Sequence, residues 1–246
     1  MNLNTVFKAL GPIDIRNVRR DSGIYWMLFL PVLSAVIIRW GVPPLTESLI
    51  QKYDFNLALY YPAILAYFFV IMAPITFSVM VGFMLLDEKD DNTLTALQVT
   101  PLSLNNYIAY RVAMPVLLTI IMMYIIFPLA NIGTLTWTQL LVTAIAAAPM
   151  SPMFALYLAS VAQNKVQGFA LMKLSGFILF LPIFAYFIHS DWELAFGLIP
   201  TYWPMKVYWM LEAGQSGVWP FVAVSIIYQS FVTWLFIRRF NKIMHQ

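Results

Sequence analysis

The polar residues that are most informative about function lie in one segment, residues 86–103. The segment begins with a run of acidic and basic side chains and continues into a stretch typical of a short helix. The side-chain oxygen of Asn92 or Thr93 suits the start of that helix, because it accepts one of the free N–H groups there. Pro101 disfavours helical backbone at Thr100 and so ends the helix. A short capped helix of this kind could bind another molecule.

An apolar stripe gives this helix a side that could be gripped. Leu94, Leu97 and Val99 form the stripe. One interpretation is that a soluble partner binds the stripe and moves the chain on either side of it, so that the helix acts as a lever. The other is that the helix rests on lipid headgroups. The residues support both interpretations.

Catalytic motifs are missing from the sequence. No Gly-Lys-Ser/Thr tripeptide occurs, so this chain has no P-loop for nucleotide hydrolysis. His189 and His245 are its only histidines and it has no cysteine, which excludes an HExxH zinc site and thiolate ligands. Polar residues within the apolar runs more often hydrogen-bond neighbouring backbone or helices than catalyse; they are Thr76, Ser78, Thr119 and Ser160. We therefore expect no enzyme activity from this chain.

The elements that must position the segment are apolar. Of the 246 residues, 61% are hydrophobic and only 10% are charged, against about 25% charged in ordinary globular domains. The mean hydropathy is +0.78. A water-soluble fold of this size could not bury that much apolar surface, so the chain is predicted to be an integral membrane protein.

Six stretches are long and apolar enough to cross a bilayer, which needs about 20 residues per helix. Stretches such as Val116–Leu129 and Phe177–Ile188 are apolar on every face, which argues against the alternating pattern of barrel strands. The predicted fold is therefore all-α with six transmembrane helices. Their ranges are Ile24–Trp40, Leu57–Leu86, Ile108–Ala130, Leu140–Val161, Phe169–Ile188 and Val218–Ile237.

The basic residues predict the orientation. If the N-terminus is inside, eleven of the 14 Lys and Arg residues fall in inner segments, and only Arg39, Lys52 and Lys206 fall outside. Because inner loops carry the excess of Lys and Arg, both termini are expected in the cytoplasm. Arg39 and Lys173 lie near span ends, where their long side chains reach the interface.

Two short segments flank the six-span bundle, residues 24–237. Residues 1–20 mix apolar and basic side chains and are expected to lie at the inner interface as an amphipathic helix, weakened at Gly11-Pro12. Residues 238–246 form a cytoplasmic tail. The whole chain, 1–246, is expected to be a single transmembrane domain.

Two patches of sequence resemble a known family. The run Glu88–Ser103 is similar to the cytoplasmic motif of ABC-2 type permeases, the membrane subunits of bacterial ABC exporters. Here Asn92 stands where that motif usually has glycine, and Thr95 where it has glutamate. Asn164–Leu174, followed by Ile199–Lys206, most resembles the fluoroquinolone-export-type branch of these permeases.

The resemblance implies a partner and a docking element. In such exporters a separate ABC ATPase, present in two copies, binds ATP and Mg and docks on a coupling helix between spans 2 and 3. The corresponding residues here are Glu88, Asn92, Thr93, Leu94, Leu97, Val99, Thr100 and Pro101. Asn164 and Lys165 would make a second cytoplasmic contact. No cofactor is expected on this chain.

The resemblance also implies an assembly and a gate. Two permease chains, identical or different, would form the pathway in a bacterial cytoplasmic membrane, in contact with lipid and with no nucleic acid. The segment Asp191–Pro204, between spans 5 and 6, is too apolar for a free loop and is broken by two prolines. The family has re-entrant helices closing an outer gate there, which points to Pro200, Tyr202, Trp203 and Pro204. An interfacial aromatic hairpin fits the same residues.

The function expected from these observations is that of a permease subunit in an ATP-driven exporter. Its pathway, rich in Phe, Tyr and Met, suits a small amphipathic or hydrophobic substrate, such as a drug, an antibiotic or a lipid-like molecule. The alternative is a membrane scaffold or sensor that recruits a cytoplasmic partner through the same segment without transporting anything.

Overall fold

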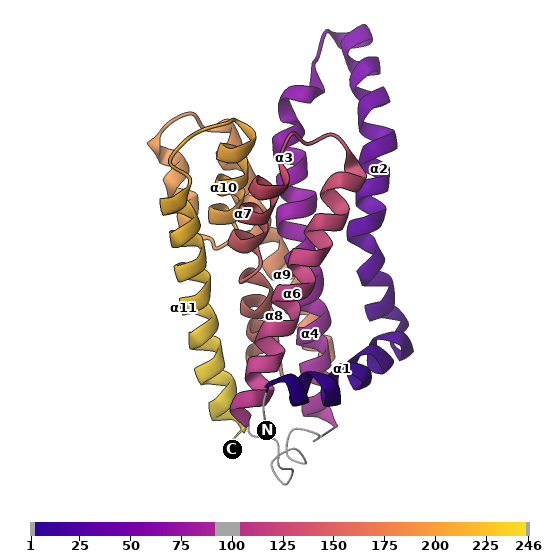
Figure 1. Cartoon of the computed structure of the whole chain (residues 1–246), viewed down its shortest axis with the longest axis vertical. Helices are drawn as coiled ribbons and strands as arrows, with labels where there is room; N and C mark the ends of the chain where they lie inside the picture. The colour runs from indigo at the N-terminus through magenta and orange to yellow at the C-terminus, as the bar shows by residue number, and fades with distance from the viewer. Residues whose placement is uncertain (1–2, 92–103, 245–246) are drawn as a thin grey trace.

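The helices of this chain stand side by side in a computed structural model that describes residues 3–91 and 104–244 (Figure 1). All regular elements of these residues are helical, so the predicted all-α fold is confirmed. The elements are α1 (Leu3–Arg20), α2 (Ser22–Tyr53), η1 (Leu57–Tyr60), α3 (Tyr61–Leu65), η2 (Ala66–Ile71), α4 (Met72–Asp90), α6 (Leu104–Ala130), α7 (Trp137–Ala147), α8 (Met150–Val161), α9 (Lys165–Phe180), η3 (Leu181–Phe187), η4 (Asp191–Leu198), α10 (Tyr202–Glu212) and α11 (Trp219–Met244).

Six helical stretches are long and apolar enough to cross a membrane, as the sequence predicts. They run over Ser22–Tyr53, Leu57–Asp90, Asn105–Ala130, Trp137–Val161, Lys165–Phe187 and Trp219–Lys242. Both ends of the described chain lie at one end of the bundle (Figure 1). We call this the terminal end and the opposite one the far end. Helix α1 lies across the terminal end, beside the ends of α4 and α6, and is continuous through Pro12 (Figure 1).

The first span is longer than the sequence predicts. It does not end near Trp40, because α2 continues through Pro43 and Pro44 to Tyr53. These prolines remove the N–H groups that would bond to the carbonyls four residues back, and Arg39 and Trp40 lie on the exposed side of the helix. The exposed side chain of Arg39 also has a protein partner, because its Nη1 donates to the Leu129 carbonyl at 3.2 Å and so caps the last turn of α6.

The core of the bundle is formed by the second and fourth spans. In their most apolar 18-residue stretches, 89% and 72% of residues are buried, against 17–28% in the other four spans. Helices α4 and α8 approach closely at Gly82, where a Cβ atom would lie 3.2 Å from the Ala155 carbonyl oxygen and 3.1 Å from a Leu158 methyl. Small residues permit this approach, which matters where dispersion replaces the hydrophobic effect between helices. The other four spans form the shell around this pair.

Two of the spans are irregular within the bundle. In the second, η2 is a π turn in which the Met72 N–H bonds to the Tyr67 carbonyl five residues back. The fourth span is broken at Pro149, between α7 and α8. Next to this break the Ala146 carbonyl accepts hydrogen bonds from Ser225 Oγ at 2.9 Å and Gln229 Nε2 at 3.1 Å. Side chains of α11 therefore satisfy backbone at the break, as a membrane interior requires.

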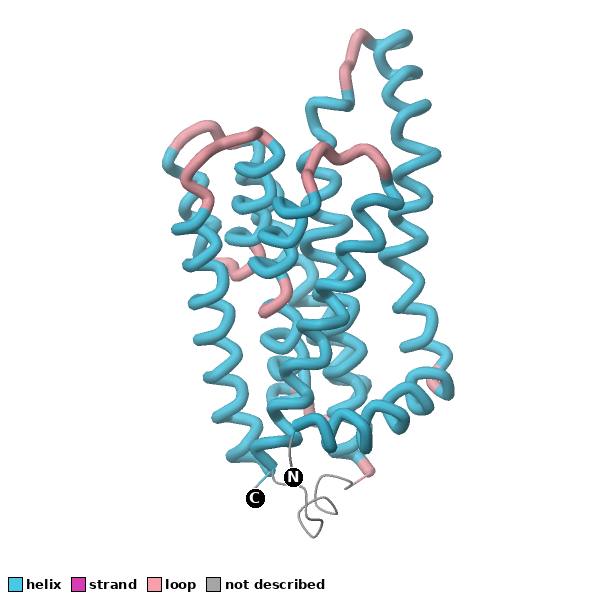
Figure 2. Tube along the Cα trace, in the orientation of Figure 1, coloured by secondary structure: helices cyan, strands magenta, loops and turns pink. Residues whose placement is uncertain are grey.

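Elements η4 and α10 form a hairpin whose turn packs within the bundle (Figure 2). At the turn, Thr201 Oγ1 donates to the Leu179 carbonyl near the end of α9 at 2.9 Å. The hydroxyl of Tyr228, in α11, donates to the Leu198 carbonyl at 2.7 Å. Between the two arms, Trp203 Nε1 donates to the Gly197 carbonyl at 2.9 Å, and a Cβ atom at Gly197 would lie 2.7 Å from the indole ring. The backbone of the turn is thus covered by protein.

Enlarging Gly82 is expected to destabilise the chain more than enlarging an exposed glycine of the same kind. Gly82→Leu places a side chain between α4 and α8, and overpacking of this kind costs about 1–3 kcal/mol. Its matched control is Gly176→Leu in α9, where no atom lies within 4 Å of the position of a Cβ. Thermal unfolding of the detergent-solubilised chain measures both. Equal melting temperatures for the two variants would contradict the close approach.

Candidate functional site

A buried cluster of charges joins three helices at the terminal end. It consists of Asp14 from α1, Glu88 from α4, and Tyr107, Tyr110 and Arg111 from α6, and we call it the Arg111 cluster. The side chains of Arg111 and Asp14 are 1% and 2% exposed, and that of Glu88 is 16% exposed. Charges this deeply buried are stable only when paired and hydrogen-bonded.

Local sequence places each member of the cluster. The buried face of α1 repeats every four residues, so Asp14 takes one position in an otherwise apolar stripe, which is Val6, Leu10, Asp14 and Val18. Tyr107 and Arg111 are also four residues apart and share one face of α6. Glu88 lies in the last turn of α4. Helices α4 and α6 are the ones that flank residues 92–103.

Each nitrogen of the Arg111 guanidinium donates to a different residue. Nη1 donates to Asp14 Oδ2 at 2.9 Å, Nη2 donates to Glu88 Oε1, and Nε donates to the Tyr107 hydroxyl at 3.2 Å. The Tyr107 hydroxyl in turn donates to Glu88 Oε2, and the Tyr110 hydroxyl donates to Asp14 Oδ2 at 2.6 Å. The guanidinium carbon also lies 5.2 Å and 5.5 Å from the two tyrosine ring centroids. Arg111 is thus the shared centre of the cluster.

A second ionic contact lies beside the first. Lys165, at the start of α9, has its Nζ 2.7 Å from Asp21 Oδ2 and 3.0 Å from Asp87 Oδ2. We call these three residues the Lys165 cluster. The hydrogen bond from Lys165 lowers the pKa of the Asp21 carboxyl, with further lowering by the N–H groups at the start of α2. Because a lowered pKa means that Asp21 stays ionised until the pH falls below its ordinary range, this contact persists at neutral pH.

The end of α8 is also held by cations. Lys89 Nζ donates to the Ala162 carbonyl at 3.2 Å, and Arg239 Nε donates to the Ser160 carbonyl at 3.1 Å. Positive groups at a helix C-terminus complement its dipole and satisfy its free carbonyls. Contacts at the end of α4 therefore reach α6, α9 and the end of α8 within three consecutive positions, 87 to 89.

A cavity of about 750 Å³ borders both clusters between α1 and the ends of α4 and α6. Its lining includes Asp14, Asp21, Asp87, Glu88 and Arg111. Among the residues that the structure describes, no group of three or more His, Cys, Asp or Glu side chains is arranged to hold a metal ion. The chemistry of this region is therefore the fixing of helix ends by ion pairs.

The residues predicted from sequence fall into three groups. Asn92, Thr93, Leu94, Leu97, Val99, Thr100 and Pro101 lie outside the described residues, so the coupling helix stays a prediction. Glu88 belongs to the Arg111 cluster, Lys165 to its own cluster, and Asn164 Oδ1 caps α9 by accepting from the Gln167 N–H at 3.0 Å. The gate residues Pro200, Tyr202, Trp203 and Pro204 lie in the η4–α10 hairpin, apart from the charged clusters.

Sequence reasoning missed most of the Arg111 cluster. The predicted third span, Ile108–Ala130, includes Arg111, but the sequence assigned no role to it or to Asp14, Tyr107 or Tyr110. Two signals were available. Asp14 is the only acidic residue among the first 20, and Arg111 is the only charged residue in the third span. The one acidic residue of the amphipathic N-terminal segment and the one charged residue of an apolar span are candidates for pairing, because an unpaired charge in the span is costly.

Comparison with known proteins gives the family. Six apolar helices with their buried ion pairs at one end define a multi-pass α-helical membrane protein of the cell membrane. The family described as "Fluoroquinolones export permease protein Rv2686c-like" matches residues 14–237, and this chain belongs to that family of membrane permeases.

Two relatives show the same likeness over nearly the whole chain. They are "Fluoroquinolones export permease protein MT2760" of Mycobacterium tuberculosis strain CDC 1551 / Oshkosh and "Fluoroquinolones export permease protein Rv2686c" of strain ATCC 25618 / H37Rv. Each is 33% identical to this chain over 238 residues, which cover 95% of this chain and 93% of the relative. No solved structure was found to match the chain.

Removing Arg111 is expected to destabilise the chain strongly. Arg111→Met leaves two buried carboxylates without their cation, a change that costs about 3–5 kcal/mol. The stability of Arg111→Lys should lie between those of Arg111→Met and the native chain, because an ammonium lacks the planar fork that reaches both carboxylates. Lys173→Met, at an exposed position of α9, is the control. Thermal unfolding in detergent measures all three.

A triple variant distinguishes the effect of unpaired charge on stability from the effect of lost packing. Adding Asp14→Asn and Glu88→Gln to Arg111→Met removes the unpaired charges and should recover part of the lost stability. A triple variant that is less stable than Arg111→Met alone would show that ion pairing is not what holds these helices.

Proposed function

We propose that this chain is the permease subunit of an ATP-driven exporter and that a separate ABC ATPase moves it through residues 92–103. Family membership supports the permease role, and the names of the two relatives support export of small amphipathic drugs. ATP and Mg would bind to the ATPase, present in two copies. A second permease chain, identical or different, would complete the pathway through the bacterial cytoplasmic membrane.

The observation that carries the proposal is the Arg111 bridge. Glu88 lies four positions before residue 92, and Tyr107 lies four positions after residue 103, so both flanks of the docking segment are fixed to one guanidinium. A force on the segment therefore acts on α4 and α6 together rather than bending a loose loop. Because Asp14 shares the same guanidinium, α1 moves with them.

Helix α4 is suited to carry such a motion inward. It is the most buried span and packs closely on α8 at Gly82. Residues Met153 and Phe154 of α8 line a small apolar cavity together with Pro200, at the turn of the η4–α10 hairpin. We infer that a shift of α4 reaches this hairpin through α8. The hairpin would then act as the re-entrant outer gate that the family resemblance implies.

Charged side chains in the docking segment should break the association with the ATPase. In the variant Leu94→Asp/Leu97→Asp, the predicted apolar stripe is lost, and burial of an uncompensated carboxylate at an interface is unfavourable. The expected result is loss of the ATPase subunit when the permease is purified by affinity from membranes. The control is Ser48→Asp/Gln51→Asp, an equal charge change at exposed positions near the far end of α2.

The same preparation tests the transport role. Retained association together with unchanged substrate-stimulated ATP hydrolysis in Leu94→Asp/Leu97→Asp would refute the coupling assignment. A scaffold or sensor would instead bind its partner without any substrate-dependent ATPase activity in the wild-type chain.

Tyr107→Phe should leave binding of the ATPase intact but weaken the coupling of ATP hydrolysis to transport. It removes one hydroxyl that joins Glu88 to Arg111 and leaves both charges and the ring in place. The ATPase should still co-purify, while transport per ATP hydrolysed in proteoliposomes falls several-fold because the flanks of the segment are less firmly joined. Tyr124→Phe, which removes a hydroxyl bonded to the Trp137 carbonyl near the far end, is the matched control. Equal transport by the two variants would argue against the bridge as a transmitting element.

A further inference from the structure

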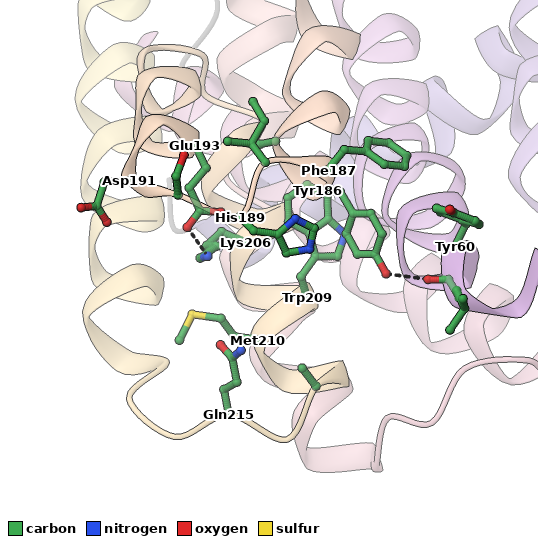
Figure 3. A pocket seen from close by; sticks show the side chains of 15 residues that line it. Tyr60, Tyr186, Phe187, His189, Asp191, Glu193, Lys206, Trp209, Met210 and Gln215 are labelled. Carbon is green, nitrogen blue, oxygen red and sulfur yellow. Dashed lines mark hydrogen bonds and ion pairs between the residues drawn. The ribbon is translucent and has the colours of Figure 1, made fainter.

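A cavity of about 740 Å³ opens at the far end of the bundle (Figure 3). Its lining comes from η1, from η3 and the residues that follow it, from the start of η4, and from α10. Neither charged cluster of the terminal end contributes to it. The volume falls within the range of about 300–1,000 Å³ that is typical of small-molecule sites. We therefore ask which ligand its lining residues would bind.

The aromatic walls of the cavity are held in place by hydrogen bonds. The Tyr186 hydroxyl donates to the Leu59 carbonyl at 2.7 Å, and Trp209 Nε1 donates to the Pro62 carbonyl at 3.2 Å. The two rings lie 5.4 Å apart, and the cavity also contacts Tyr60 (Figure 3). Fixed aromatic faces suit a flat ring system, because little side-chain freedom is lost when such a ligand binds.

One ion pair lies in the same wall. Lys206 Nζ lies 2.5 Å from Glu193 Oε1 (Figure 3), and the two side chains are only 19% and 22% exposed. His189 and Asp191 also line the cavity. A ligand can open the Lys206–Glu193 pair only if it supplies a partner to each charge, since a largely buried charge left alone is costly. A carboxylate on the ligand replaces Glu193, and an ammonium replaces Lys206.

We propose that this cavity binds an aromatic zwitterion, with its carboxylate on Lys206, its cationic amine on Glu193 and its ring against Tyr186 and Trp209. The assignment rests on the proposed function, and it specifies the substrate class that the exporter releases at its far end. Molecules with a single charge leave either Lys206 or Glu193 unpaired and bind more weakly. Neutral molecules leave the pair closed and gain only the contacts with the rings.

The test measures binding to the full chain in lipid nanodiscs, with empty nanodiscs as the background for partition into lipid. The probe is norfloxacin, an aromatic zwitterion of the drug class that gives the two relatives their names. Two derivatives isolate its charges. The methyl ester lacks the carboxylate, and the N-acetyl derivative lacks the cationic amine. Fluorescence anisotropy of the quinolone ring reports binding of all three.

The wild-type chain should bind norfloxacin about tenfold or more tightly than either derivative, the difference expected for one charge-assisted hydrogen bond. The double variant Lys206→Gln/Glu193→Gln keeps the side-chain sizes and removes both charges, so it should bind all three molecules with similar affinity. Trp192→Ala, at a 79% exposed position of η4 outside the cavity, should behave like the wild type.

Three results would overturn the assignment: no saturable binding of norfloxacin, equal affinity of the wild type for the three molecules, or a preference for norfloxacin that persists in the double variant. Co-purification of the ATPase is independent of this cavity. If the ATPase co-purifies with the wild-type chain but norfloxacin is not preferred over its derivatives, only the cavity assignment fails. If norfloxacin is preferred but no ATPase co-purifies with the wild-type chain, only the exporter proposal fails.

Discussion

The guanidinium of Arg111 is the constraint on which the terminal end of the bundle depends. It is almost fully buried and donates to Asp14, Glu88 and Tyr107, which lie on three different helices. A buried cation cannot lose a partner without a large cost, so these helix ends hold fixed positions relative to one another. Since two of them flank residues 92–103, that segment is mounted on a rigid base whatever molecule contacts it.

Elsewhere the bundle is held by side-chain packing and by side-chain hydrogen bonds to the backbone where helices are interrupted. Spans two and four approach through Gly82 and the small side chains of α8, where dispersion is the main attraction. The break at Pro149 and the turn at Pro200 interrupt helical hydrogen bonding, and side chains of α11 donate to carbonyls beside both: Ser225 to Ala146, and Tyr228 to Leu198. Such sites are deformable without loss of a buried charge. Motion is therefore easier along the α8–hairpin contact than within the Arg111 cluster.

The sequence could predict the membrane spans, which the bilayer requires to be apolar. It could not predict contacts between residues that are far apart in the chain. The six spans follow from hydropathy, because each must satisfy its own backbone in a medium without water. The first predicted range ends at Trp40, whereas α2 continues through Pro43 and Pro44 to Tyr53. The Arg111–Asp14 pair joins residues 97 positions apart, which no local pattern encodes. The turn of the η4–α10 hairpin hydrogen-bonds to α9 and α11, and its role as a re-entrant gate stays a prediction.

The two ends of the molecule use ion pairs in opposite ways. At the terminal end one cation serves two carboxylates, two tyrosine rings cover it, and exposure is 1–2% for the most buried pair. A cavity of similar size borders this cluster, but a ligand there would have to replace two carboxylates and a tyrosine hydroxyl at once. At the far end Lys206 and Glu193 form a single pair, about a fifth exposed, beside a large cavity. That pair can exchange partners while the surrounding rings stay fixed. The proposed coupling requires the first property, and the proposed zwitterion site requires the second.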